Sequence, residues 1–251
     1  MKKLLMVGML SFGLALPGWG QLQRICHYGV MPTDNITTLE FSPSLTVTDD
    51  SGGVSSSQLT FKTYRVINPH YNWGIEVPLV RYESPEKSVN GLGDTALSLT
   101  WVKPETAHNL GYGAKMEFFV PTATDKRLGS GQLQASPALF AVWTNGFGWY
   151  AAAAYKHYVS VVGDHAREDI NYGRFRLNIS YLSENKWWIQ ANGYYFQNFH
   201  ETGKMEFVPE IEVGTLVNEG TAFYINGGTH AAGNWHSKDW NIGVGFKVLY
   251  L

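Results

Sequence analysis

The sequence predicts an all-β fold, a twelve-stranded antiparallel transmembrane β-barrel of the outer-membrane type. Three observations predict it: apolar residues at every second position, twelve similar segments, and connections that alternate between short and long. In segment 239–250, the residues at even positions from Trp240 to Tyr250 are all apolar. Such a strand has one apolar and one polar face. A membrane barrel turns the apolar face to lipid, whereas a soluble sandwich would bury it.

Composition supports the membrane interpretation. Charged residues make up 16% of the chain, below the quarter or so of a typical soluble domain, and aromatic residues make up 14%. No basic block is present, so nucleic acid is not an expected partner. Cys26 is the only cysteine, which excludes an intramolecular disulfide.

The first twenty residues have the layout of a secretory signal. Lys2 and Lys3 precede an apolar run over 4–16, and Gly18-Trp19-Gly20 is a small-x-small cleavage site. We expect cleavage before Gln21 and export to the outer membrane; an uncleaved anchor is the alternative. Residues 21–35 lack alternation and could form a periplasmic tail or fold into the lumen. The barrel is expected over 36–251.

Twelve segments have the length and alternation of tilted membrane strands, which need about 9–11 residues. Twelve is even, as single-chain bacterial barrels require. The predicted strands are 36–48, 56–67, 72–83, 94–103, 110–121, 132–144, 147–159, 170–182, 186–197, 204–217, 220–230 and 239–250.

The connections between these segments fall into two classes. With a periplasmic N-terminus, the periplasmic turns are short, at 68–71, 104–109, 145–146, 183–185 and 218–219. The outer loops are mostly longer, at 49–55, 84–93, 122–131, 161–169, 198–203 and 231–238. Short periplasmic turns and long outer loops are typical of these barrels.

Tryptophans are expected at the membrane interfaces, where their rings are half wet. The assigned topology places six of them at periplasmic strand ends and two at the outer end. The periplasmic set is Trp73, Trp101, Trp143, Trp149, Trp187 and Trp188, and the outer set is Trp235 and Trp240.

The polar face of the predicted strands carries charges of both signs. One interpretation is a narrow, water-filled pore that filters solutes by charge; the other is an internal salt-bridge network that closes the barrel. The predicted lumen-lining residues are Glu40, Lys62, Glu76, Lys115, Glu117, Lys156, Arg174, Arg176, Glu210, Glu212 and Lys247, with Glu206 as a further acidic candidate.

No metal, cofactor or catalytic residue is predicted. His165, His200, His230 and His236 lie in outer loops with several carboxylates, but without a firm ligand spacing. A serine and a histidine also occur together in the loop sequence 234–237, yet no short motif joins them to an acid.

A family resemblance comes from the central third of the chain. Its residues are Gly91-Leu92-Gly93-Asp94, Phe119-Val120-Pro121-Thr122, Leu128-Gly129-Ser130-Gly131 and Ser136-Pro137-Ala138-Leu139. Their order resembles the outer-membrane proteins of the MetA-pathway of phenol degradation family. Ala123 stands where that family commonly has glycine. The resemblance implies an outer-membrane channel, with aromatic or other small hydrophobic compounds as candidate solutes.

The sequence therefore predicts a channel or transporter for small solutes. Expected partners are outer-membrane lipid and lipopolysaccharide, the barrel-assembly machinery and a small-molecule solute. A structural barrel with a plugged lumen is the first alternative, and an outer-membrane lipid hydrolase is the second. Two structural expectations test the register: Glu40 and Lys247 meet across the closing seam, and ten apolar side chains face lipid. These are Phe41, Leu45, Leu97, Leu99, Phe118, Leu139, Leu177, Ile179, Val244 and Phe246.

Overall fold

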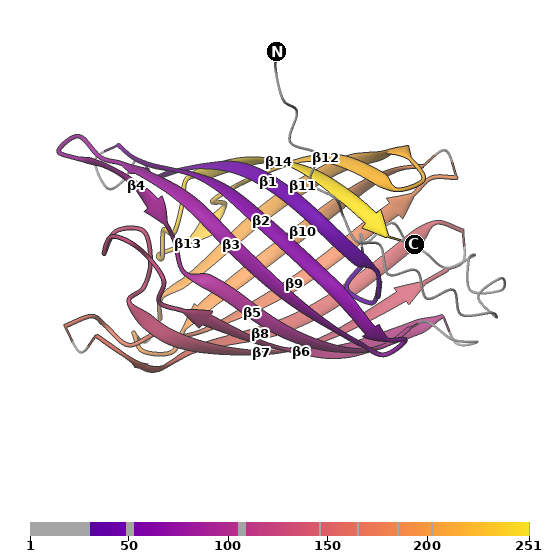
Figure 1. The fold of residues 1–251 in the computed structure, drawn as a ribbon, viewed down its shortest axis with the longest axis horizontal. Helices are drawn as coiled ribbons and strands as arrows, with labels where there is room; N and C mark the ends of the chain where they lie inside the picture. Colours follow the sequence, from indigo (N-terminus) through magenta and orange to yellow (C-terminus); the bar gives the residue numbers. More distant parts are fainter. Residues whose placement is uncertain are drawn as a thin grey trace, which may run out of the picture.

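The computed structural model describes residues 31–48, 53–104, 109–145, 147–164, 166–184, 186–201 and 203–250. These residues form a closed antiparallel β-barrel whose strands are tilted to its axis (Figure 1). The predicted fold class is confirmed. No helix in the described ranges is long and apolar enough to cross a membrane. The predicted signal segment 1–20 lies outside the described residues.

Twelve long strands build the barrel wall, and two short strands extend it. Each long strand pairs with its neighbours along the chain, because short connections make antiparallel hairpins the simplest route. The long strands are β1 Thr37–Thr48, β2 Val54–Asn68, β3 Tyr71–Glu83, β5 Thr95–Lys103, β6 Leu110–Val120, β7 Gln132–Thr144, β8 Trp149–Gly163, β9 Asn171–Leu182, β10 Trp187–Asn198, β11 Met205–Asn218, β12 Thr221–Thr229 and β14 Trp240–Tyr250.

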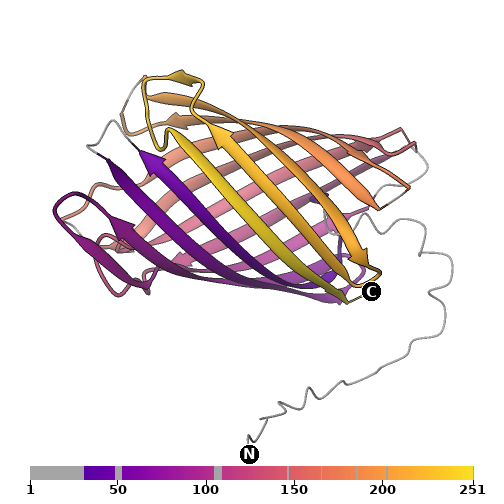
Figure 2. The ribbon, with the colours of Figure 1, turned by 90° about the horizontal axis from the view of Figure 1, so that it is seen from above.

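The first and last strands close the barrel. β1 and β14 are antiparallel, with Thr37 opposite Tyr250 and Val47 opposite Trp240, and Figure 2 shows the indigo and yellow strands side by side. Glu40 lies directly opposite Lys247, so the predicted seam and register are confirmed. Closure pairs the two edges of the described sheet with each other, so neither edge faces lipid unpaired.

Two short strands lie where the sequence predicts loops. β4 (Ser88–Leu92) pairs with β3, and β13 (Ala232–Gly233) pairs with β11. β3 exchanges partners at Pro78: up to Glu76 it pairs with β5, and from Leu79 onward with β4. The prediction of a loop over 84–93 was therefore wrong for residues 88–92, because the hairpin continues beyond the wall and satisfies its own backbone groups.

Apolar side chains cover the outer face as predicted. Leu139, Ile179 and Leu177 are 66%, 59% and 54% exposed, although such residues would be buried in a soluble protein. Leu97, Leu99, Phe118 and Phe246 are also exposed. Phe41, Leu45 and Val244 are half-buried. An exposed apolar belt of this kind requires lipid as its solvent.

Tryptophans follow the predicted girdle with two exceptions. Trp73, Trp143, Trp149, Trp187 and Trp240 are exposed on the outer face, but Trp188 is only 1% exposed. Because successive residues of a strand point to opposite faces, Trp187 faces outward and Trp188 inward. Trp235 also departs from the prediction, since it packs against Tyr172 and Phe196.

An apolar cluster lies at the end of the barrel that carries the short connections. Met31 and Ile36, which precede β1, are buried there with inward-facing side chains of the wall. The wall residues in this cluster are Val142, Tyr150, Ala152, Leu182, Trp188, Leu216, Ala222, Tyr224 and Leu249. Apolar side chains of the wall and of the segment before β1 thus pack together at this end of the barrel.

Candidate functional site in the barrel interior

A buried carboxylate at the seam organises the first interior cluster. Register places Glu40 between Lys62 on β2 and Lys247 on β14. Lys62 Nζ lies 2.9 Å from Glu40 Oε1, and Lys247 Nζ lies 3.5 Å from Oε2. The Tyr224 hydroxyl donates a hydrogen bond of 2.8 Å to Oε1. Three donors thus compensate the desolvation of one carboxylate.

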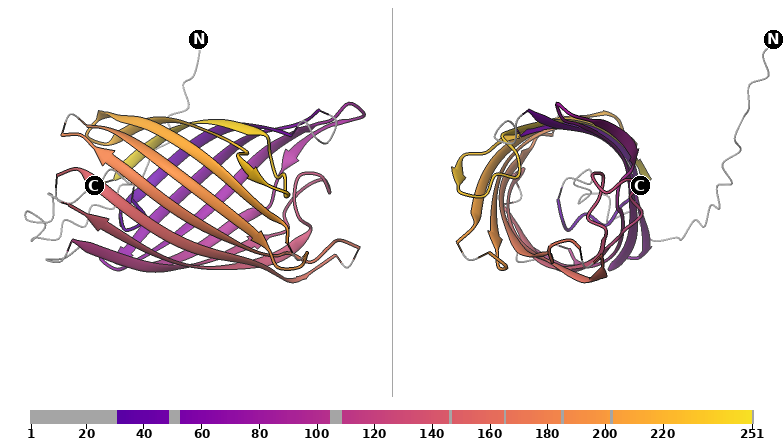
Figure 3. Two further views of the ribbon diagram at one scale, coloured as in Figure 1. Left: turned by 180° about the vertical axis from the view of Figure 1, so that it is seen from behind. Right: turned by 90° about the vertical axis from the view of Figure 1, so that its left-hand side faces the viewer.

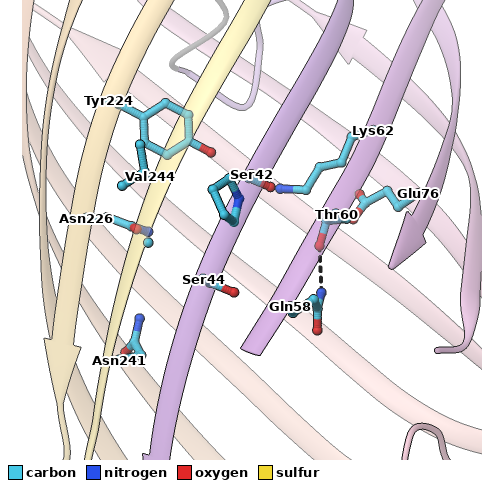
Figure 4. A pocket seen from close by; sticks show the side chains of 12 residues that line it. Ser42, Ser44, Gln58, Thr60, Lys62, Glu76, Tyr224, Asn226, Asn241 and Val244 are labelled. Atoms are coloured by element: carbon cyan, nitrogen blue, oxygen red, sulfur yellow. Dashed lines mark hydrogen bonds between the residues drawn. The ribbon is translucent and has the colours of Figure 1, made fainter. Parts of the chain in front are cut away.

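Glu76 extends this cluster along the lumen. It lies opposite Lys62 on β3 and accepts a hydrogen bond from the Tyr64 hydroxyl. A cavity of about 300 Å³ opens beside these side chains (Figure 4). Its lining is Ser42, Pro43, Ser44, Gln58, Thr60, Lys62, Glu76, Tyr224, Asn226, Asn241, Gly243 and Val244. A space of this size with hydroxyl, amide and charged groups is suited to water and small polar solutes.

A second cluster surrounds Glu117 on β6. Lys115 Nζ lies 2.8 Å from Glu117 Oε1, and Lys156 of β8 pairs with Oε2. Glu117 is only 3% exposed, so both ion pairs are largely desolvated on the acid side. Lys156 also lies over the rings of Phe119 and Tyr158, with 5.1 Å and 4.6 Å from Nζ to the ring centroids. These cation–π contacts hold the Lys156 ammonium against the two rings.

Two arginines on β9 have different surroundings. Arg176 donates from Nε and Nη2 to Asn192 Oδ1, at 2.9 Å and 2.7 Å. Arg174 instead lies between two aromatic rings, with Cζ 5.7 Å from the Tyr158 centroid and 5.6 Å from the Tyr194 centroid. Arg176 Cζ also lies 5.5 Å from the Tyr194 centroid, so both guanidinium groups contact this ring and only that of Arg176 is hydrogen-bonded as well.

Strand β11 contributes the remaining acids. Trp188 Nε1 donates to Glu212 Oε1 at 2.8 Å, and the Tyr194 hydroxyl lies 3.5 Å from Glu210 Oε1. Glu206 is fully buried and accepts hydrogen bonds from the Ser237 hydroxyl and backbone N–H. Burial lowers the pKa of the adjoining loop residue Lys238, although Glu210 and Glu206 oppose the shift.

The interior contains residues that sequence reasoning missed. They are the aromatic residues Tyr158, Tyr172, Tyr194 and Phe196, together with the amides of Asn178 and Asn192. Each has the same parity in its strand as a predicted charge, for example Tyr158 with Lys156, and Tyr172 with Arg174. Parity alone could therefore have placed them in the lumen. The prediction considered only charged side chains, so it named lysine, arginine and glutamate and omitted aromatic and amide residues.

Three of the four segments that carry the family resemblance meet in one hydrogen-bonded unit. Asp94 Oδ2 accepts from the Ser130 backbone N–H at 2.6 Å and from its hydroxyl at 2.7 Å. The Thr122 hydroxyl donates to Gly93 O at 2.9 Å. A Cβ on Gly129 would collide with Asp94 Oδ1, so only glycine fits there. These contacts hold the connection 121–131 against Gly93 and Asp94, which link β4 to β5.

This connection turns into the outer end of the barrel. Viewed along the axis, its magenta-to-pink ribbon lies within the ring of the wall (Figure 3). Arg167 from the next outer connection donates to Gly129 O at 2.6 Å and to Lys126 O at 2.9 Å. Hydrogen bonds from Arg127 lower the pKa of Asp125 to about 2. The two connections therefore brace each other and narrow the mouth.

Two of the outer histidines, His230 and His236, lie side by side at the outer end of the barrel. No group of three or more His, Cys, Asp or Glu residues in the described ranges could hold a metal ion. The rings of His230 and His236 lie 3.8 Å apart, and His165 falls outside the described residues. The Ser237 hydroxyl donates to Glu206 Oε2 at 2.6 Å, and His230 Nδ1 lies 3.2 Å from Glu206 Oε1.

Comparisons with known proteins place the fold among outer-membrane channels. No family model matches the sequence, and no curated protein does. Among solved structures, the COG4313 outer membrane channel from Pseudomonas putida F1 is similar over 89% of this chain and 98% of its own, with a TM-score of 0.73 and 11% identity. The KdgM porin aligns over 85% and 99%, with a TM-score of 0.59 and 10% identity.

A third neighbour is the CymD monoaromatic hydrocarbon channel. It aligns over 86% of this chain and 89% of its own, with a TM-score of 0.50 and 9% identity. At such identities the similarity establishes the barrel fold and nothing about residues of the interior. The chain thus has the fold of outer-membrane channels and porins.

Proposed function

We propose that this chain is a narrow outer-membrane channel for small solutes, including aromatic or other small hydrophobic compounds. The observation that carries the proposal is the polar cavity of about 300 Å³ inside a closed barrel with an apolar outer belt. An interior lined with hydroxyls, amides and charges stays hydrated, whereas a barrel filled for stability alone would pack apolar side chains.

The predicted lumen charges would set selectivity in this channel. Glu40, Glu117 and their lysines hold fixed charges at two levels, and Arg174 and Arg176 add positive charge to the β9 wall. Membership of the MetA-pathway family, cleavage of segment 1–20 and recognition by the barrel-assembly machinery belong to the same proposal. Similarity to the COG4313 channel supports a channel function, and similarity to CymD, a monoaromatic hydrocarbon channel, supports an aromatic solute.

A plugged structural barrel is the second candidate, and the paired charges favour it. Glu40 and Glu117 each bind two lysines, and the buried apolar cluster with Met31 lies at one end. Conductance distinguishes the two candidates. An open channel conducts ions through lumen water even where charges are paired, whereas a plugged barrel excludes water and does not conduct.

The test uses the purified barrel in planar lipid bilayers and in liposomes. We expect discrete steps of small conductance and swelling of liposomes in arabinose. Ser44→Trp fills the cavity from its lining and should reduce both signals, whereas Leu45→Trp, on the outer face of the same strand, should leave them unchanged. Absence of steps and of swelling for the folded wild-type protein would favour the plugged barrel.

A further inference from the structure

Arg174 is a cation on the lumen face without a carboxylate partner. Within the described part of the chain it makes no hydrogen bond or ion pair, and its side chain contacts the rings of Tyr158 and Tyr194. The other lumen cations differ: Lys62 and Lys247 bind Glu40, Lys115 and Lys156 bind Glu117, and Arg176 binds Asn192. The five N–H donors of this half-buried guanidinium have no acceptor among the described residues.

The two rings that contact this guanidinium belong to a larger aromatic cluster. Tyr158 and Tyr172 stack with centroids 4.4 Å apart and 18° between planes. Trp235 lies edge-on to Tyr172 at 5.4 Å and to Phe196 at 6.2 Å. Tyr194 continues the series at 6.4 Å from Phe196. The rings come from β8, β9, β10 and the loop before β14, and two of them, Tyr158 and Tyr194, contact the Arg174 guanidinium directly.

The charged groups near Arg174 do not compensate its positive charge. Lys156 lies directly opposite it on β8, and like charges in that position repel. Glu117 offsets Lys156 but is already shared with Lys115. Glu210 faces the Tyr194 hydroxyl at 3.5 Å, and Asn192 occupies Arg176. A bound anion would offset the charge that these groups leave uncompensated.

We propose that Tyr158, Tyr172, Arg174, Tyr194, Phe196 and Trp235 form a binding site for small aromatic carboxylates. The guanidinium binds the carboxylate through two parallel N–H donors, and the flanking rings contact the aromatic ring of the solute. A neutral hydrocarbon would lack the ion pair with the guanidinium, and a short aliphatic acid would lack the ring that the flanking aromatic side chains contact. The inference deepens the proposed channel function and rests on it.

Equilibrium binding tests the site independently of conductance. Isothermal titration calorimetry on the detergent-solubilised barrel uses benzoate, acetate and benzyl alcohol as probes. We expect benzoate to bind at least about tenfold more tightly than either of the others, because one lacks the ring and the other the charge. Equal affinity for benzoate and acetate, or for benzoate and benzyl alcohol, would overturn the site.

Variants locate the interaction. Arg174→Gln should weaken benzoate binding about tenfold or more, and Arg174→Lys should weaken it less, because an ammonium keeps the charge but cannot form the planar fork. Arg65→Gln removes an exposed arginine from β2 and serves as the matched control, with unchanged binding. Unchanged benzoate affinity in folded Arg174→Gln would refute the assignment.

Two further measurements keep the test decisive. If Arg174→Gln does not fold, Tyr194→Leu should weaken benzoate but not acetate, and equal weakening of both would refute the aromatic part. In planar bilayers, benzoate should interrupt the ion current at lower concentration than acetate. A barrel that conducts but ignores benzoate retains the channel function and loses this site, whereas a barrel that binds benzoate without conducting retains the site and loses the channel.

Discussion

Removal of the Glu117 charge should destabilise the barrel strongly. In Glu117→Gln, the carboxylate that pairs with Lys115 and Lys156 becomes a neutral amide of nearly the same shape. Two lysines then remain inside the barrel beside Arg174, which lies directly opposite Lys156. The substitution leaves the backbone and the volume unchanged, so its effect reports on charge pairing.

The expected loss follows from burial. Breaking a buried ion pair by removing one partner typically costs about 3–5 kcal/mol, since the remaining charge loses its compensation. The side chains of Lys115 and Lys156 retain 22% and 12% exposure to the lumen, and lumen water would hydrate them in part. We therefore expect a loss near the lower limit, about 3 kcal/mol in the free energy of unfolding.

Urea unfolding in lipid vesicles, followed by tryptophan fluorescence, measures this loss. The control is Glu83→Gln, because Glu83 pairs with Arg81 at the surface, where both side chains are well exposed and the pair contributes at most about 1 kcal/mol. Adding Lys156→Met to Glu117→Gln should recover part of the stability. A loss below about 0.5 kcal/mol for Glu117→Gln would show that lumen water, not the lysines, solvates this carboxylate.

Three further predictions concern the outer face, the outer mouth and the orientation. Val244→Arg places a charge on the face of β14 that also carries the exposed Ile242 and Phe246, and should destabilise the barrel by about 2–4 kcal/mol in vesicles. The Asp125 pKa is lowered by Arg127 from 3.8 to about 2, so its contribution to loop order, followed by NMR, is complete above pH 4 and disappears as the pH falls through about 2. An impermeant reagent on intact cells should label Ser237→Cys and not Asn218→Cys; the opposite pattern would reverse the topology.

The seam and the outer face could be predicted because a strand has a strict period of two. Once the last strand is assigned, its inward residues include Lys247, and the first strand places Glu40 at the same depth. A one-residue slip would turn one of the two into lipid, which leaves a single acceptable register. The same logic predicts the exposure of Leu139 and Ile179. These features depend on local alternation and on closure alone.

The outer mouth could not be predicted because it depends on contacts between connections. Glycine and serine in 121–131 are typical of any loop. Nothing in their order shows that Asp94 accepts hydrogen bonds from Ser130, which lies 36 residues further along the chain. The continuation of β3 into β4 was missed for a similar reason: Gly91 and Gly93 indicate a turn, yet they lie where Thr124 and Leu128 of the other connection approach closely.

The distinction between paired and open charges in the lumen depends on register between strands. Lys156 reaches Glu117 across β7, where Ser136 and Ala138 are the intervening inward residues, and only small side chains leave that path clear. Arg174 lies beside Lys156 on one side and Phe196 on the other, so neither neighbouring strand offers it a carboxylate. A count of charges makes the interior look balanced. The register shows that acids and bases are paired only in local clusters. The positive charge of Arg174 has no paired acid on the neighbouring strands, and a solute anion could compensate it.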